Sequence, residues 1–265
     1  MKPDISTHDK IRNAAACIEV ENLHARHCFM HCAGRNVEEI DHYWMYTDKA
    51  SWGHSFGKWT TWQGVKFGWG SSLERQGYGT YLELTQVWPQ VTGLDPRPLA
   101  EAAMHTLATD IIEVAQDGKT ARAYFYTPGC ISSTLNVSGH REGAWMWERY
   151  GIEYIYDEEA QAWRFLTIQV CPDLMLPMDN ANPAQMSMES IRSHAAPPEF
   201  GGGGAAQVLG VGGPIAPIVD EPEPVHAAWG LTQTVQNPVP WPQPYETYDE
   251  KRSYRYRVKD WPAEE

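Results

Sequence analysis

The chain is poor in basic residues and contains no long apolar run. Its 265 residues include 21 Lys and Arg against 34 Asp and Glu, which gives a net charge of −13. Nucleic acids and anionic membrane surfaces bind clustered positive charge, so this balance argues against both as partners. No segment approaches the roughly 18 apolar residues that a membrane-spanning helix needs, and the start MKPDISTHDK lacks the apolar core of a secretory signal. We therefore expect a cytoplasmic protein.

Cysteine is also sparse, and the common catalytic sequence motifs are missing. The five cysteines are scattered and odd in number, which favours free thiols over a disulfide framework. The sequence contains no Walker loop, no G-x-S-x-G, no H-E-x-x-H and no dinucleotide fingerprint. The glycine runs GWGSS and GGGG do not lead into a phosphate-binding helix. Nothing here indicates nucleotide-dependent or serine-hydrolase chemistry.

Phenylalanine is scarce, but the other aromatic residues are abundant. The chain has 6 Phe against 12 Trp and 13 Tyr. Trp and Tyr combine an apolar body with a polar group, so a wall built from them suits an aromatic or oxygenated small molecule. The alternative is that these residues form the core and the contacts between subunits.

The clearest predicted helix spans residues 9–33 and ends in the segment RHCFMHC. A stripe of mostly apolar residues steps along it by three and four: Ile11, Ala15, Ile18, Asn22, Ala25, Phe29 and Cys32. Cys28 and Cys32 lie on this apolar side, whereas His27 and His31 lie about 100° further round the helix. The four side chains therefore do not converge, and we interpret the segment as helix packing and expect no metal.

The remaining pattern predicts helices followed by long antiparallel strands. A second helix is expected over 36–47 and a third near 63–75, with a short strand and turn between them. Asp-Gly and acidic turns then separate strands that pair as two hairpins. The expected strands are 104–114 with 120–129, and 143–157 with 162–171. This order indicates an α+β fold in which a curved sheet packs on the N-terminal helices.

The C-terminal third has a different composition. It is rich in Gly and Pro and has no helical or strand period, but Trp229, Trp241, Tyr245 and Trp261 recur through it. We therefore divide the chain into a domain over 1–175 and an extended C-terminal arm over 176–265. The arm is expected to pack on its own or a neighbouring subunit, and the alternative is a disordered tail.

Two strand segments resemble the SnoaL-like branch of the NTF2-like superfamily. IIEVAQDGKTARAYFYTPG is similar to the branch's hairpin motif, and Trp145, Trp147, Tyr150, Trp163 and Arg164 match its later aromatic positions. The resemblance covers about residues 9–175. It implies a cone-shaped α+β barrel with one deep apolar pocket, whose enzymes work without a metal or organic cofactor. Within the branch, the chain is most like the bacterial diarylpropane lyases of lignin catabolism, which release the γ-carbon as formaldehyde.

Candidate site residues follow from strand parity and from the geometry that the resemblance implies. The candidate catalytic residues are His105, His54, Tyr43, Arg149 and Asp41. The candidate substrate-binding residues are Lys58, Tyr126, Trp44, Trp52, Trp59 and Trp147. No metal ligand is included.

These residues can be given roles in a deformylation. Arg149 or Lys58 would stabilise the substrate phenolate, and Tyr43 or Asp41 would help the α-hydroxyl leave. His105 or His54 would then take the γ-hydroxyl proton, while tryptophans stack on the aryl rings.

Several candidates also have a purely structural interpretation. His105 and His54 would then be structural or surface histidines, and Asp41 a solvated helix residue. Arg149 would pair with its neighbour Glu148 on the outer face of the sheet, and Tyr126 would only pack.

The sequence therefore favours a cofactor-independent carbon–carbon lyase acting on a 1,2-diarylpropane-1,3-diol. One alternative is a dehydratase, isomerase or cyclase acting on another aromatic or polyketide-like molecule. The other is a non-catalytic small-molecule binder or assembly subunit. The long aromatic arm favours a homo-oligomer, with a trimer preferred over a dimer.

Overall fold

A computed structural model describes the helices, the sheet and part of the C-terminal arm. The described residues are 6–54, 57–71, 81–82, 85, 89–94, 101–133, 142–177, 220–221, 239–256 and 261–262. The helices are α1 (Thr7–Cys32), α2 (Asn36–Tyr43) and α3 (Thr61–Val65), with short turns η1 (Lys66–Gly70), η2 (Pro89–Val91) and η6 (Glu250–Arg252). The strands are β1 (Ser51–His54), β2 (Gly57–Thr60), β3 (Glu101–His105), β4 (Ala108–Val114), β5 (Thr120–Ser133), β6 (Glu142–Asp157) and β7 (Ala162–Pro177).

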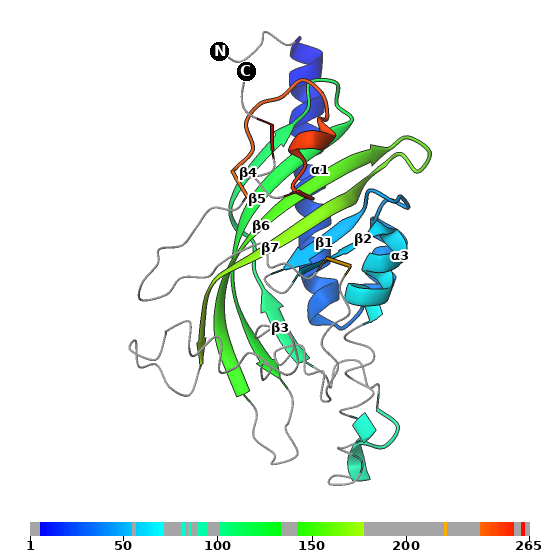
Figure 1. The fold of residues 1–265 in the computed structure, drawn as a ribbon, viewed down its shortest axis with the longest axis vertical. Helices are drawn as coiled ribbons and strands as arrows, with labels where there is room; N and C mark the ends of the chain where they lie inside the picture. The colour runs from blue at the N-terminus through cyan, green and yellow to red at the C-terminus, as the bar shows by residue number, and fades with distance from the viewer. Residues whose placement is uncertain are drawn as a thin grey trace.

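The strands form one curved sheet in the order β2-β1-β7-β6-β5-β3, and β4 also pairs with β5. All pairs are antiparallel except β1 with β7. The register of β6 against β7 shifts at two places, and such bulges bend and twist long strands. Figure 1 shows the resulting bend, and the described strands do not close into a barrel. The expected α+β architecture is confirmed.

Both predicted hairpins are present, as β4–β5 and β6–β7, but the strand expected over 104–114 is split in two. β3 pairs with the C-terminal part of β5, and β4 pairs with its N-terminal part. The break lies opposite Pro128, which has no N–H to donate to a ladder. The Thr106 hydroxyl donates instead to the Pro128 carbonyl.

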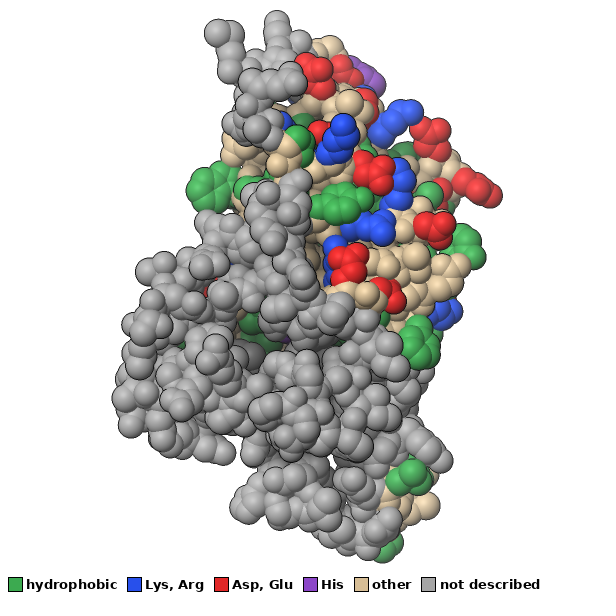
Figure 2. Space-filling view, in the orientation of Figure 1, with side chains coloured by type: hydrophobic (Ala, Val, Ile, Leu, Met, Phe, Trp, Pro, Cys, Tyr) green, Lys and Arg blue, Asp and Glu red, His purple; other side chains and the backbone are tan. Residues whose placement is uncertain are grey.

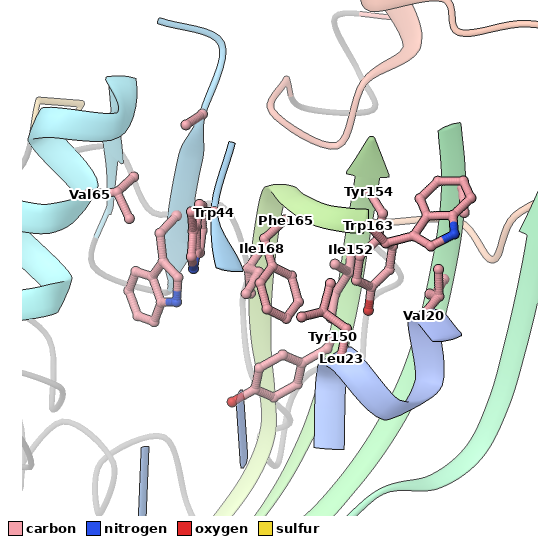
Figure 3. Packing of buried hydrophobic residues seen from close by; sticks show 14 of the residues in the cluster. Val20, Leu23, Trp44, Val65, Tyr150, Ile152, Tyr154, Trp163, Phe165 and Ile168 are labelled. Carbon is pink, nitrogen blue, oxygen red and sulfur yellow. The ribbon is translucent and has the colours of Figure 1, made fainter. Parts of the chain in front are cut away.

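The main core lies between α1 and the sheet. Figure 3 shows Val20 and Leu23 of α1 close to Tyr150 and Ile152 of β6 and Phe165 of β7. All five side chains are buried. Apolar burial of this kind contributes about 1.5–3 kcal/mol for each large side chain. This face of the sheet is called the inner face below.

The face of α1 that packs on the sheet is not the predicted one. Ile11, Ile18 and Phe29 are 67%, 61% and 77% exposed, so the prediction that their stripe is buried is wrong. The opposite side is buried: Ala16, Val20, Leu23, His24, His27, Cys28 and His31. On both sides of α1, residues that could be buried recur every three or four positions. The curved sheet packs against the side that carries the histidines.

The second predicted helix is also shorter than expected. α2 ends at Tyr43 because Trp44 turns into an extended conformation and bridges to Phe165 of β7. The Met45 N–H then donates to the Phe165 carbonyl at 2.9 Å. Within the described residues, no helix is long and apolar enough to cross a membrane.

The outer face of the sheet is covered by residues 239–256 of the same chain (Figure 1). Arg122 of β5 donates to the carbonyls of Asp249 and Arg252, and its guanidinium lies 5.0 Å from the Tyr245 ring centre. Ser253 donates to the buried Glu153 carboxylate. Basic and acidic side chains are interspersed over the described part of the surface in Figure 2. This segment therefore belongs to the folded domain on the side away from α1.

Candidate active site

A row of buried histidines lines the inward side of α1. His24, His27 and His31 are 0%, 2% and 5% exposed and follow one another at helical spacing. Their rings are stacked, with centroids 5.4 Å apart for His24 and His27 and 6.1 Å apart for His27 and His31. His24 also stacks on Phe125 of β5. Three aligned imidazoles replace the apolar side chains that a helix normally buries.

Glu39 of α2 anchors the middle of this row. Its Oε1 accepts hydrogen bonds from His27 Nδ1 and from the Trp44 indole, each at 2.9 Å. A carboxylate can only accept, so the proton of this imidazole lies on Nδ1. Glu39 is completely buried, and the two donors offset part of the cost of burying a carboxylate.

Glu148 of β6 is the point at which several polar side chains meet. Its Oε2 lies 3.4 Å from His105 Nδ1 and accepts from the Tyr150 hydroxyl at 3.3 Å, and its Oε1 lies 3.7 Å from His54 Nε2. The 3.4 Å contact to His105 is close but not directed as a hydrogen bond. Glu148 is 1% exposed, and the His54 side chain, at 14%, is the most exposed of the group. These four residues, Glu148, His54, His105 and Tyr150, are called the Glu148 centre below. The centre is closest to solvent at His54.

The histidine row continues into this centre. The ring of His31 lies 5.0 Å from that of His105 and 4.7 Å from that of Trp69, which stacks on Trp52. His31 Nδ1 contacts Asn36 Oδ1 at 3.3 Å. The polar cluster therefore runs without interruption from Glu39 to Glu148 along the inner face of the sheet.

Burial keeps most of these groups uncharged at neutral pH. Desolvation lowers the pKa of His31 and the pKa of His105 to about 3, although Glu148 opposes the effect at His105. Desolvation also lowers the pKa of His24 well below its usual value. It raises the pKa of Tyr150 well above its usual value, and the nearby Glu148 carboxylate adds to this effect. The centre thus offers neutral imidazoles and a phenol beside a carboxylate.

Several buried polar atoms of this region have no hydrogen-bond partner within the part of the chain that the structure describes. They are both ring nitrogens of His24, Nδ2 of Asn36, Oε2 of Glu39 and the hydroxyl of Tyr154. More than nine in ten buried polar groups in proteins are paired, so such a concentration is unusual. Unpaired groups of this kind are typical of sites that bind a ligand or move protons.

Two predicted catalytic residues, His105 and His54, are brought together by the structure, one on each side of Glu148. Trp52 lies flat against the His54 ring, with centroids 5.6 Å apart and an interplanar angle of 13°. β1 carries His54 and Trp52, and β3 carries His105. Strands that are distant in the sequence therefore build the centre.

Arg149 and Tyr126 lie on the outer face of the sheet, away from this centre. Arg149 donates to both oxygens of Asp173 at 2.6 and 2.5 Å and to the Tyr124 hydroxyl at 3.0 Å. Tyr126 donates to the same Asp173 carboxylate at 3.1 Å. Successive residues of a strand point to opposite faces, so Arg149 cannot share a face with Glu148. The alternative interpretation is therefore right that Arg149 forms an ion pair on the outer face, but its partner is Asp173 and not Glu148.

The other polar candidates also lie outside the cluster. Asp41 is exposed and bound to Lys66. Tyr43 accepts a long 3.4 Å hydrogen bond from Arg26 on the surface. Lys58 is buried, but its ammonium group contacts Glu221 at 2.9 Å and donates to the carbonyl of Arg255.

The tryptophan candidates fall into two groups. Trp44, Trp52 and Trp59 are 3%, 1% and 2% exposed in the main core, and Trp44 holds Glu39. Trp147 is half-buried. It lies two residues before Arg149 on β6, so its side chain is on the same outer face of the sheet as Arg149. Trp52 reaches the Glu148 centre through its ring contact with His54.

The sequence interpretation missed the residues at the heart of the cluster. They are His24, His27, His31, Glu39, Glu148 and Tyr150. Two signals were available: the i, i+3, i+7 spacing of the three histidines, and the alternation that places Glu148 and Tyr150 on one face of a strand. Neither signal states which face is inward.

The segment RHCFMHC does not gather metal ligands. Burial raises the pKa of the Cys28 thiol to about 12. Across the ranges that the structure describes, no group of three or more His, Cys, Asp or Glu side chains has metal-binding geometry. His27 and His31 instead belong to the buried row.

Comparison with known proteins yields structural likeness only. No protein-family model and no curated protein matches the chain. Solved structures that resemble it include hexachlorocyclohexane dehydrochlorinase LinA-type3 from Novosphingobium barchaimii. It is 14% identical with a TM-score of 0.40, and the match covers 65% of this chain and 94% of that one.

Two further structures show the same level of likeness. An NTF2-like superfamily protein from Salmonella enterica is 14% identical with a TM-score of 0.40, covering 59% of this chain and 90% of that one. Aln2 from a Streptomyces species is 13% identical with a TM-score of 0.38, covering 59% and 89%. At these values the likeness concerns the arrangement of helices and sheet, and no activity follows from it.

Proposed function

We propose that this protein is a cofactor-independent acid–base lyase that converts a lignin-derived 1,2-diarylpropane-1,3-diol into a stilbene and releases formaldehyde. The observation that carries the proposal is the convergence of His54, His105 and Tyr150 on the buried carboxylate of Glu148. The substrate class comes from the sequence resemblance to diarylpropane lyases.

The proposed reaction requires proton transfers and no external oxidant or reductant. In the first step the α-hydroxyl leaves as water while the para phenol loses its proton, which forms a quinone methide. In the second step the γ-hydroxyl is deprotonated and the bond between the β- and γ-carbons breaks. Its electron pair restores the aromatic ring, and formaldehyde leaves. Stilbene, water and formaldehyde account for every atom of the diol.

The geometry suggests a role for each group at the centre. Glu148 is the base that takes the γ-hydroxyl proton, and His54, which approaches solvent, delivers a proton to the leaving α-hydroxyl. His105 Nδ1 lies 3.4 Å from Glu148 Oε2, and burial lowers the pKa of His105 to about 3, so it places a neutral imidazole beside the base. Tyr150 donates to Glu148 and orients its carboxylate. Trp52, stacked on His54, provides an aromatic surface beside the reacting groups.

A second candidate function is a dehydratase, isomerase or cyclase acting on another aromatic molecule. The same pair, His54 and Glu148, could remove water without breaking a carbon–carbon bond. A non-catalytic binder is less well supported because a binder does not need two titratable groups directed at one point.

The test is to incubate the protein with the diol and excess chelator and to follow formaldehyde and stilbene fluorescence together. Equal amounts of both products support the lyase. Loss of water without formaldehyde would indicate the dehydratase, and binding without turnover would indicate a binder.

Variants then test the assignment of the base. Glu148→Gln should lower kcat/KM by about 10²–10⁴-fold, the usual contribution of a general acid or base. Glu153→Gln is the matched control, because Glu153 is a buried carboxylate of the same strand on the outer face. Equal activity losses in the two variants would contradict the role of Glu148.

A further inference from the structure

The exposed side of α1 carries a complete heptad pattern. Positions 11, 15, 18, 22, 25 and 29 alternate steps of four and three over most of this 26-residue helix. They are occupied by Ile11, Ala15, Ile18, Asn22, Ala25 and Phe29. These six residues are called the α1 seam. A repeat of this kind is the pattern by which two helices pack side by side.

The α1 seam faces directly away from the core of its own domain. Ile11, Ala15, Ile18, Asn22 and Phe29 are exposed, and Ala25 is partly buried. In heptad notation Ile11 and Ile18 are d positions and Phe29 is an a position. The f positions on the opposite side of the helix are Val20 and His27, which are 0% and 2% exposed. The helix is therefore apolar on two opposite sides, and among the described residues only one of them packs against the sheet.

We propose that the α1 seam binds the α1 seam of a second copy of this chain, in parallel and around a two-fold axis. Three large apolar side chains, each more than 60% exposed on one line, are costly to leave in water. The single polar residue of the line, Asn22, occupies an a position, where paired asparagines fix register and favour two strands.

The charges beside the seam select the parallel orientation. In a parallel pair, each g residue faces the e residue five positions later on the other helix. Glu21 is at g and Arg26 is at e, so each Glu21 faces an Arg26 of opposite charge, twice around the axis. An antiparallel pair would instead place g against g and e against e, which brings like charges together. Both residues are exposed. Arg26 also donates the long 3.4 Å hydrogen bond to Tyr43, which the contact with Glu21 would replace.

The first test is the mass of the protein in solution by light scattering. The wild type should have twice the 30.0 kDa mass of the chain, and Ile18→Glu should have the mass of one chain with an unchanged helix signal. Leu94→Glu is the matched control, because Leu94 is 53% exposed and lies outside the seam, and it should leave the mass unchanged. A wild type of single-chain mass, or an assembly that survives Ile18→Glu, would overturn the proposal.

The second test distinguishes the orientation and the number of helices. Glu21→Arg and Arg26→Glu should each raise the dissociation constant about threefold to tenfold, and the double variant should restore it. Single variants without effect, or a double variant that is weaker than both, would overturn the parallel arrangement. A mass three times that of the chain, as in the trimer expected from the sequence, would overturn the two-fold axis. None of these results depends on the proposed lyase activity.

Discussion

Acidification should destabilise this protein because its buried histidines take up protons less readily than they do in the unfolded chain. The pKa of His31 and that of His105 are lowered to about 3 by burial, against about 6.5 in an unfolded chain. Between these values the unfolded state binds more protons than the native state, so stability falls as pH falls. The loss begins near pH 6.5 and continues towards pH 3. His24, whose pKa is lowered by the same cause, acts in the same direction.

The size of this effect follows from the two pKa values. Each pH unit below 6.5 costs about 1.4 kcal/mol for each such histidine. Lowering the pH from 7.5 to 5.0 should therefore cost about 2 kcal/mol each for His31 and His105, or about 4 kcal/mol together. For a chain of this size, that corresponds to a decrease in Tm of roughly 8–16 °C.

The assay is urea unfolding followed by tryptophan fluorescence at the two pH values. His105→Gln should reduce the pH-dependent loss by about 2 kcal/mol, the contribution of this one histidine. His8→Gln is the control, since the His8 side chain is 90% exposed and lies outside the buried row of histidines. An unchanged loss in His105→Gln, or a wild type equally stable at both pH values, would refute the reasoning.

Three further changes have defined outcomes. Gly151→Val should displace Val239, whose side chain occupies the space of the missing Cβ, and should cost about 1–3 kcal/mol in urea unfolding, with faster proteolysis of residues 239–256. Arg122→Ala should cost about 3–5 kcal/mol by thermal unfolding, because it leaves the buried Glu153 carboxylate without its 3.1 Å partner. A cost below 1 kcal/mol would show that this pair is not needed. Cys28 should resist alkylation at pH 8 in the native protein because the pKa of its thiol is about 12. Mass spectrometry of the alkylated peptide measures the rate of labelling. Rapid labelling would mean that the helix opens there.

Most of the secondary structure was predictable because it depends on local signals. Residues 7–32 form the predicted helix, since Ser6 accepts from the Asp9 N–H at its start and Gly34 adopts a φ of 66° after its end. The turn at Gly118 and the β6–β7 hairpin likewise lie where the sequence predicted them. These features require only a few neighbouring residues, so no tertiary contact is needed to predict them.

Part of the candidate site was also predictable from the sequence. Strand parity and the geometry implied by the resemblance point to His105 at the start of a predicted strand and to His54 in the loop after the second helix. The structure brings both to one carboxylate. The carboxylate itself was not selected. Glu148 and Arg149 are adjacent in sequence, and only the packing of β6 decides which of them faces α1.

The same limit applies to α1, where the sequence determined a helix with two apolar sides but not which side is inward. Only the tertiary structure decided this, because the sheet could receive either Ile18 and Phe29 or His24 and His27 at similar helical spacing. Burial of the histidine side places three imidazoles against Phe125 and Tyr150 and leaves the α1 seam exposed. The periodicity of the sequence determines which side chains of a helix share a face. The surface that packs against the helix, here the sheet, determines which face is removed from water.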